Sequence, residues 1–248
     1  MNYDLLIDLH KANKRQGPGG DEQTIQALQL AGLTDSSDPL KIADIGCGTG
    51  ASTLTLAEHL NADITAVDLF QDFLDILNAD AKKHGVADKI TTLAGPMEEL
   101  PFEEGSLDVI WAEGAIYNMG FAKGVEYFKR FLKPGGILAA SEITWLTNER
   151  PTEIQQHWDA EYPEIATASD KIKVLEEHGF VLKGYFPLPE SNWIENYYTP
   201  LENACDAFLN KHNSDDAQAI IEAEKIEVSL YKKYQSYFSY GFYIAQKI

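Results

Sequence analysis

The sequence predicts an α/β fold in which a doubly wound, mostly parallel, seven-stranded sheet ends in an antiparallel strand. Short apolar segments alternate with segments of helical period between residues 40 and 143, the pattern of a parallel sheet with helices on both faces. A glycine-rich turn, Gly46–Gly50, joins the first apolar segment to a helix-like one. The acid Asp68 ends the second apolar segment. Together these three observations indicate a nucleotide-binding type of sheet.

The chain begins with two segments of helical period that precede the predicted sheet. Residues 3–15 form the first, and the strong breaker Gly17-Pro18-Gly19-Gly20 ends it. Asp21 is expected to cap the second helix, which runs to about Leu30 and is followed by a linker from Thr34 to Pro39. We expect both helices to lie over the ligand edge of the sheet. An ordinary helix–helix turn is the simpler alternative for the glycines.

The alternation of strand and helix occupies the next part of the chain. The expected strands are residues 40–45, 63–68, 89–94, 107–112 and 136–143. The expected helices are residues 51–61, 71–84 and 121–132. Lys133-Pro134-Gly135-Gly136 is expected to end the last of these helices and to turn the chain into the following strand.

After this region the alternation stops. Residues 145–168 and 189–235 are rich in aromatic residues and helix formers, with a helix (170–178) and a strand (180–187) between them. Residues 238–248 predict a final strand in a hairpin-like pair. We expect one domain with four parts, which are a helical lid (1–35), a core (36–144), a helical and aromatic region with one strand (145–236) and the final strand (237–248).

The net charge of the chain limits the classes of partner it can bind, and its cysteines indicate its cellular compartment. With 20 Lys and Arg against 39 Asp and Glu, the formal net charge is -19. A nucleic-acid partner needs a basic face and an anionic membrane repels an acidic protein, so neither partner is expected. Cys47 and Cys205 lie in the glycine turn and in an expected helix, which argues against a disulfide framework. Asp4 and Asp8, together with the lack of a long apolar run, predict a cytoplasmic protein.

The glycine turn is the first candidate binding element. Gly46, Gly48 and Gly50 permit a positive φ and leave room for a ligand against the backbone, and the amides of the following helix point at that ligand. Such a turn binds nucleotide-like cofactors in general, and with Ala51 as its third member it also fits the looser dinucleotide fingerprint. A tight turn without a ligand is the alternative.

Asp68 is the second candidate. It ends an expected strand about twenty residues after the glycine turn, where a carboxylate can accept both hydroxyls of a ribose. An acid at this place can also merely cap the next helix. The turn and the acid together are a better signal than the turn alone.

Five segments lead from these elements to a family. IADIGCGTG, AVD, EELPF, SLDVIW and FKRFLKPGGILAASE occur in this order between about residues 38 and 145. In this order and spacing they resemble the class I S-adenosylmethionine-dependent methyltransferases, and most of all the small-molecule methyltransferases similar to those of ubiquinone and menaquinone biosynthesis. The resemblance implies a Rossmann-like core, S-adenosylmethionine as the cofactor and methyl transfer to a small organic acceptor.

The resemblance also implies which residues bind the cofactor. Those expected around its methionine and ribose parts are Asp44, Gly46, Cys47, Gly48, Gly50, Asp68 and Glu113. Within this set Asp44 reaches the amino-acid end through water, Asp68 accepts the ribose hydroxyls, and Glu113 lies under the methionine.

The adenine end carries one departure from the family pattern. Leu69 is expected to pack on the adenine, and Met97 and Glu98 to contact its edge and face. Family members often have Gly-Asp where this chain has Gly95-Pro96. The usual carboxylate for the adenine amino group is therefore missing, and Glu98 is its expected substitute.

Methyl transfer from a sulfonium needs mainly an aligned acceptor and a site without water, with a general base only for a hydroxyl or an acidic carbon. The candidates are Glu113, Tyr117 and Glu142, with His157 as a weaker one. Glu113 and Glu142 follow strands, where ligands of such sheets bind. Tyr117 is expected near the methyl group or in packing, and His157 on a polar helix is more typical of a surface histidine. No metal is expected.

The aromatic residues of the helical region are the candidate walls of an acceptor pocket. They are Trp145, Trp158, Trp193, Tyr197 and Tyr198. They form either an apolar lid over the strand ends or simply the core of this region. The expected partner is a small-molecule acceptor, and a homodimer is left open. A nicotinamide-dependent oxidoreductase and a cofactor-binding module without turnover are the alternative functions.

Overall fold

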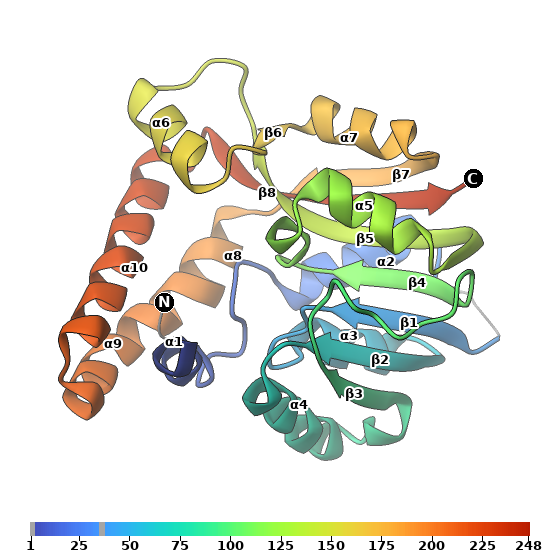
Figure 1. Ribbon diagram of the computed structural model, residues 1–248, viewed down its shortest axis with the longest axis horizontal. Helices are drawn as coiled ribbons and strands as arrows, with labels where there is room; N and C mark the ends of the chain where they lie inside the picture. The colour runs from blue at the N-terminus through green and yellow to red at the C-terminus, as the bar shows by residue number, and fades with distance from the viewer. Residues whose placement is uncertain (1–2, 35–37) are drawn as a thin grey trace.

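The computed structural model describes residues 3–34 and 38–248, so residues 35–37 of the predicted linker lie outside it. Its strands are β1 (Leu40–Ile45), β2 (Ala62–Asp68), β3 (Ile90–Ala94), β4 (Leu107–Ala112), β5 (Leu132–Trp145), β6 (Ala166–Thr167), β7 (Phe180–Pro187) and β8 (Phe238–Lys247). Seven of them follow the order β3-β2-β1-β4-β5-β8-β7, and the short β6 pairs with the end of β5 (Figure 1). The predicted doubly wound sheet is confirmed.

The direction of the strands also follows the prediction. β1 pairs in parallel with β2 and β4, β2 with β3, and β4 with β5. β8 runs antiparallel between β5 and β7, as expected for the final strand. Because β1, β2, β4 and β5 are parallel, their carboxyl ends meet at one edge of the sheet, where ligands of such folds bind.

The helices cover both faces of the sheet and one of its edges. They are α1 (Tyr3–His10), α2 (Asp21–Ala31), α3 (Ala51–His59), α4 (Gln71–His84), α5 (Phe121–Lys129), α6 (Thr152–Glu161), α7 (Ala168–Glu177), α8 (Glu190–Trp193), α9 (Thr199–His212) and α10 (Asp215–Tyr234). The short turns are η1 (Ala87–Lys89), η2 (Ile116–Asn118) and the π-helical η3 (Ile194–Tyr198). Figure 1 shows α5 and α7 in front of the sheet, with α2 and α3 behind it.

Alternating side chains of the strands fill two cores, one on each face. Ile42 and Ile64 pack with Leu28 of α2 and Leu56 of α3, whereas Ile45 faces α5 on the other side. This inward and outward alternation is a property of the strand itself, because successive side chains point to opposite faces. The two cores hold the strand ends rigidly in place.

A third core forms the helical region beside the carboxyl edge of the sheet. Leu9 of α1 and Phe208 of α9 pack there against the ends of β5 and β8, Trp145 and Phe238. In Figure 1 α1, α9 and α10 stand to the left of the sheet, on the side toward which β4 points. The two predicted N-terminal helices therefore pack in different places: α2 packs on the sheet and α1 packs in the helical region.

Several boundary predictions were wrong, among them that of the helix expected over residues 121–132, which ends at Lys129. α1 ends at His10 instead of residue 15, and Gly20, with extended backbone at φ -162, takes the N-cap position that Asp21 was expected to fill. Lys133–Gly136 lies inside β5, which begins at Leu132, because the pairing with β4 shifts its register there and Gly135 adopts φ +79. The Pro-Gly-Gly signal thus marks a β-bulge.

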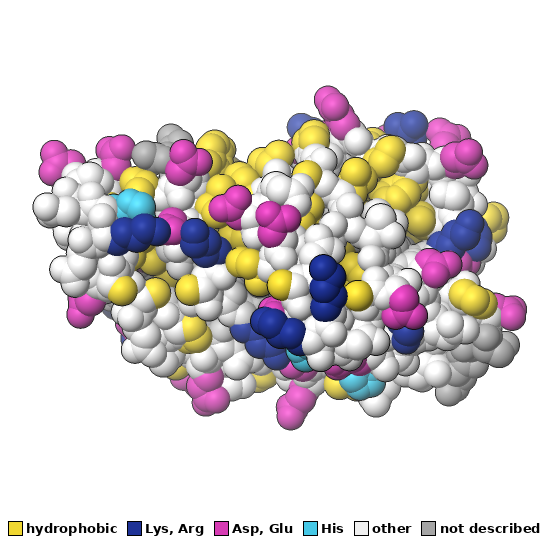
Figure 2. All heavy atoms as spheres, turned by 90° about the horizontal axis from the view of Figure 1, so that it is seen from below, with side chains coloured by type: hydrophobic (Ala, Val, Ile, Leu, Met, Phe, Trp, Pro, Cys, Tyr) yellow, Lys and Arg dark blue, Asp and Glu magenta, His cyan; other side chains and the backbone are white. Residues whose placement is uncertain are grey.

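On the face drawn in Figure 2, acidic side chains are spread widely and basic ones are scattered between them. Within residues 3–34 and 38–248, no helix combines the length and apolar character that crossing a bilayer requires.

Candidate functional site

The glycine turn lies between β1 and α3 and is bound to the end of β2. The amides of Gly46 and Cys47 donate to the Val67 carbonyl at 2.8 and 3.1 Å. The amide of Gly48 donates to Oδ2 of Asp68 at 2.8 Å, and Oδ1 of Asp68 accepts from the Phe70 amide at 3.0 Å. Burial raises the pKa of Asp68. The glycine turn and the Asp68 carboxylate, both of which the sequence indicated, are therefore joined by a hydrogen bond.

Asp44 holds a carboxylate in the interior just before this turn. Its side chain is 1% exposed, and its Oδ2 accepts from the hydroxyls of Ser52 at 2.9 Å and Thr53 at 2.6 Å. Its Oδ1 is buried and has no hydrogen-bond partner in the described part of the chain. Burial, aided by the nearby charge of Glu113, raises the pKa of Asp44 to about 7. A cation beside Oδ1 would offset this unfavourable burial.

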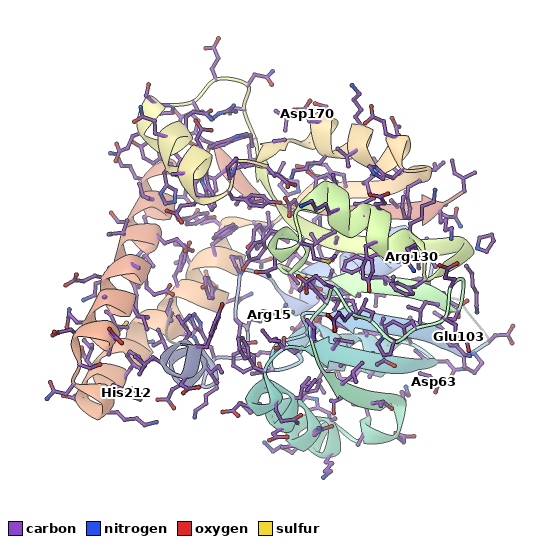
Figure 3. The ribbon with its side chains drawn as sticks, viewed as in Figure 1. Arg15, Asp63, Glu103, Arg130, Asp170 and His212 are labelled. Atoms are coloured by element: carbon purple, nitrogen blue, oxygen red, sulfur yellow. The ribbon has the colours of Figure 1, made fainter. Side chains whose placement is uncertain are left out.

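Glu113, just past the end of β4, is held by three donors. It accepts from Arg15 Nη1 at 2.9 Å, from the Thr24 hydroxyl at 2.6 Å and from Trp111 Nε1 at 2.9 Å. The side chains of Arg15 and Glu113 are each 8% exposed. Arg15 was missed by the sequence reasoning, although a cation directly before Gln16-Gly17-Pro18 is a signal that was available. In Figure 3 Arg15 lies at the centre of the molecule, between the sheet and the helical region.

The segment after α1 folds across the glycine turn. Gln16 Oε1 accepts from the Thr49 amide at 2.9 Å, and the Thr49 hydroxyl donates to the Lys14 carbonyl at 3.1 Å. Gly48 has φ +55, and a Cβ built on it would lie 2.2 Å from Gln16 Oε1, so only glycine fits there without a shift.

A cavity of about 80 Å³ lies between this segment and the turn. The residues that line it are Arg15–Pro18, Gly46–Gly48, Ala51, Ser52, Glu113 and Gly114. Predicted residues that follow two separate strands, β1 and β4, thus meet an unpredicted N-terminal segment at one place. The backbone of the glycine turn and the Arg15 side chain line the cavity, and the buried Oδ1 of Asp44, which has no hydrogen-bond partner in the described residues, lies just before the turn. These donors and this acceptor suit a zwitterionic amino acid joined to a ribose. S-adenosylmethionine fits these residues.

The residues predicted for the adenine are more scattered. Leu69 is 57% exposed at the end of β2. The Met97 methyl group lies 3.7 Å from a Cβ built on Gly46, which places Met97 beside the glycine turn. Glu98 is exposed. Their roles toward the adenine stay predictions.

A second cavity, of about 520 Å³, adjoins the first and shares Gln16–Pro18 and Gly114 with it. Its aromatic walls are Tyr117, His157, Trp158, Tyr162, Trp193, Tyr197 and Tyr240. The π-helical turn η3 joins α8 to α9, and the residues that flank and fill it, Trp193 and Tyr197, both line this cavity. Such turns are frequent at functional sites.

The candidate aromatic residues divide between the two interpretations of the sequence. Trp158, Trp193 and Tyr197 line the cavity and also pack in the core of the helical region, so both interpretations hold for them. Trp145 instead packs on Phe238 and under Arg150, whose guanidinium lies 4.1 Å from the ring centroid. Tyr198, at 0% exposure, belongs to the core of the helical region.

The candidate bases occupy three different settings. Tyr117 and His157 line the larger cavity, and burial raises the pKa of Tyr117. Glu142 is 0% exposed beneath that cavity, where it accepts from the Tyr162 hydroxyl and from Lys171 Nζ, both at 2.7 Å. Burial raises the pKa of Glu142 against the pull of Lys171. Glu113 lines the smaller cavity with its donors in place.

Comparison with known proteins gives one family and several similar chains. Residues 42–136 match the model of a methyltransferase domain. The 27-O-demethylrifamycin SV methyltransferase of Amycolatopsis mediterranei is 27% identical over 236 residues, which are 92% of this chain and 85% of that protein. The chain spans 61%, 29% and 35% of the length of three other curated relatives.

Two solved structures share the fold over nearly the whole chain. A methyltransferase from Geobacter sulfurreducens, in complex with S-adenosylhomocysteine, has a TM-score of 0.84 at 18% identity and covers 99% of this chain and 98% of its own. A [4+2]-cyclase has a TM-score of 0.76 at 19% identity and covers 99% of this chain and 93% of its own. At these identities the likeness concerns the fold alone.

Proposed function

Residues 42–136 of this chain belong to the class I S-adenosylmethionine-dependent methyltransferase domain, and from this premise we propose that the chain transfers a methyl group to a small organic acceptor. The observation that carries the proposal is the pair of adjoining cavities. The smaller is walled by the glycine turn and Glu113, and the larger by aromatic rings. This arrangement supports a cofactor site in the smaller cavity and an acceptor site in the larger one.

The residues that line the smaller cavity, and the two acids beside it, have distinct roles in holding the cofactor. Bound S-adenosylmethionine supplies an electrophilic methyl group on a sulfonium. Asp44 gives the α-ammonium a carboxylate oxygen that lacks a partner in the described residues. Arg15 holds the Glu113 carboxylate at the cavity wall, and Asp68 accepts hydrogen bonds from the ribose hydroxyls. The amides of the glycine turn face the same space.

The acceptor side aligns its ligand and keeps water away. Gln16–Pro18 and Gly114 border both cavities, so this segment closes the boundary between them. Among the three predicted bases, Tyr117 lines the acceptor cavity, which makes it the group best placed to touch the acceptor. Glu142 holds Tyr162, and Glu113 holds Arg15, so both act by positioning another side chain.

The organisation of the whole chain is part of the proposal. We take the lid to be the segment from Lys11 to Gly20, which contacts the glycine turn through the bonds of Gln16 and Lys14 with Thr49, whereas α2 packs on the sheet. A cytoplasmic location is supported by Cys47 and Cys205, which are both buried and unpaired. Light scattering measures the molar mass in solution and so distinguishes a monomer from a homodimer.

Two experiments test the function in sequence. S-adenosylhomocysteine should raise the melting temperature while NADH leaves it unchanged, and the opposite result would replace the methyltransferase by an oxidoreductase. Incubation with methyl-labelled S-adenosylmethionine and a fractionated metabolite extract should then give a labelled small product. Cofactor binding without any labelled product would indicate a binding module that does not transfer methyl groups. The [4+2]-cyclase shares this fold, which is why that outcome is tested.

A further inference from the structure

The larger cavity combines aromatic faces with carboxylates. Its wall includes Trp193, whose ring lies 5.1 Å from that of Tyr240, and Tyr117, whose ring lies 6.1 Å from that of Tyr162. Glu161, Glu224 and Glu227 line the same space. Aromatic faces carry negative charge density, so rings and carboxylates favour the same kind of ligand group.

Glu224 and Glu227 stand three residues apart on α10 and therefore on the same side of that helix. Glu227 Oε1 accepts from the Tyr198 hydroxyl at 2.9 Å. Glu224 Oε1 lies 3.5 Å from His10 Nε2, whereas its Oε2 is buried without a hydrogen-bond partner in the part of the chain that the structure describes. Burial, with the charge of Glu224 beside it, raises the pKa of Glu227 to about 7.

Tyr197 adds a further aromatic ring to the cavity wall. It is 7% exposed and lines the cavity, and its ring lies 6.3 Å from that of His10 and 5.1 Å from that of Tyr198. The ring therefore belongs both to the cavity wall and to the core of the helical region.

The positive charges nearby are already neutralised. Over the described ranges, neither lysine nor arginine lines the larger cavity. Lys171, behind the Tyr162 ring, is paired with Glu142 at 2.7 Å, and Arg15 is paired with Glu113 and Asp21 at 2.9 and 3.0 Å. His157 is the remaining basic side chain on the described wall. The acids of α10 therefore face a space without a strong counter-charge.

We infer that the acceptor carries a cationic amine, which lies among these rings against Glu224 and Glu227. This inference rests on the proposed function, because it takes the larger cavity as the acceptor site. An anionic acceptor would meet the carboxylates at close range, and a neutral apolar one would leave their oxygens unpaired. An ammonium group satisfies the carboxylates and the aromatic faces together.

The test compares three probes that share one aromatic body and differ in charge. Phenethylamine, phenethyl alcohol and hydrocinnamate are titrated into the protein in the presence of S-adenosylhomocysteine, and tryptophan fluorescence reports binding near Trp158 and Trp193. The amine should bind about tenfold more tightly than the alcohol, and hydrocinnamate should bind most weakly. Equal affinities, a preference for hydrocinnamate, or no binding of the amine at ~10 mM would overturn the inference.

Variants then assign the preference to the carboxylates. Glu224→Gln/Glu227→Gln should remove the preference for the amine, while Glu222→Gln, an exposed position on the same helix, should keep it. An unchanged preference in the double variant contradicts the inference, and the comparison of probes on the native protein stands even if that variant folds poorly. Calorimetry with S-adenosylhomocysteine is run in parallel, so that loss of the proposed function is seen separately as loss of cofactor binding.

Discussion

The guanidinium of Arg15 donates to the carboxylate of Glu113 at 2.9 Å, across 98 positions of the chain and with both side chains nearly buried. The bond ties the segment after α1 to the end of β4. It also places a positive charge at the wall of the smaller cavity. The segment after α1 thus contributes side chains to the wall of the site in addition to covering it.

Arg15→Met should lower the free energy of unfolding by about 3 kcal/mol, because it leaves the buried Glu113 carboxylate without its charged partner. It should also weaken the binding of S-adenosylhomocysteine. Chemical denaturation and calorimetry measure the two effects. Lys14→Met is the control, since Lys14 is 66% exposed and its surface ion pair contributes little. Equal losses in the two variants would contradict the role of Arg15.

Gly48→Ala should weaken cofactor binding at least tenfold, because its Cβ would displace Gln16 from the glycine turn. Gly32→Ala is a matched control, since Gly32 also has a positive φ, +69, but nothing lies within 4 Å of the added Cβ. Both variants should lose about 1–2 kcal/mol of stability from the left-handed backbone. Only Gly48→Ala should lose affinity in calorimetry, and a similar affinity in both would count against the close fit.

Asp68→Ala should weaken the binding of S-adenosylhomocysteine by about 1–3 kcal/mol, the cost of losing charge-assisted bonds to hydroxyls. It also removes the acceptor of the Gly48 amide. Asp63→Ala serves as the control, because Asp63 is an exposed residue of the same strand that Figure 3 shows far from Arg15. A dissociation constant that does not change in Asp68→Ala would remove the ribose assignment.

The affinity for S-adenosylhomocysteine should rise with pH toward about 7 and level off above it. The Asp44 carboxyl keeps its proton up to about that pH in the free protein, and the α-ammonium of the ligand favours its charged form. Calorimetry in buffers of different ionisation enthalpy should show proton release below pH 7. Asp44→Asn should flatten the profile, and an equally steep profile in that variant would assign the effect to another group.

The same pKa shift predicts the stability of the ligand-free protein. The folded state holds a proton on Asp44 that the unfolded chain loses above its ordinary pKa of 3.8. The contribution of this carboxyl to the free energy of unfolding is therefore full at low pH and declines as the pH rises from 3.8 to about 7. Comparison of denaturation curves for the native protein and Asp44→Asn isolates this contribution.

Lys171→Met should lower the free energy of unfolding by about 3 kcal/mol, because Glu142 would then be buried without a cation. Adding Glu142→Leu should recover much of the loss, since no buried charge remains. Lys173→Met, on the exposed side of the same helix, controls for the substitution. If the double variant were less stable than Lys171→Met, the pair would not be the origin of the loss.

Local patterns account for most of the predicted fold. β1 and β4 have the predicted bounds, and so does α4, because each is a short apolar or periodic segment between clear breakers. Lys133–Gly136 misled because proline and glycine mark bulges as well as turns, and the choice depends on the neighbouring strand β4. The prediction that Asp21 caps α2 was wrong because its carboxylate is held in ion pairs by Lys14 and Arg15, which the local pattern does not show.

The sequence by itself determined the alternating strands and helices of the sheet, the glycine turn and the acid Asp68 at the end of the second strand, because residue period, breakers and spacing are properties of the local sequence. Only the tertiary structure decided that Arg15 reaches Glu113, that Glu142 is neutralised by Lys171, and that Glu224 and Glu227 face the aromatic cavity. Each of these joins segments far apart in the chain. Their meeting depends on how whole helices pack on the sheet, and no local pattern of residues encodes that packing.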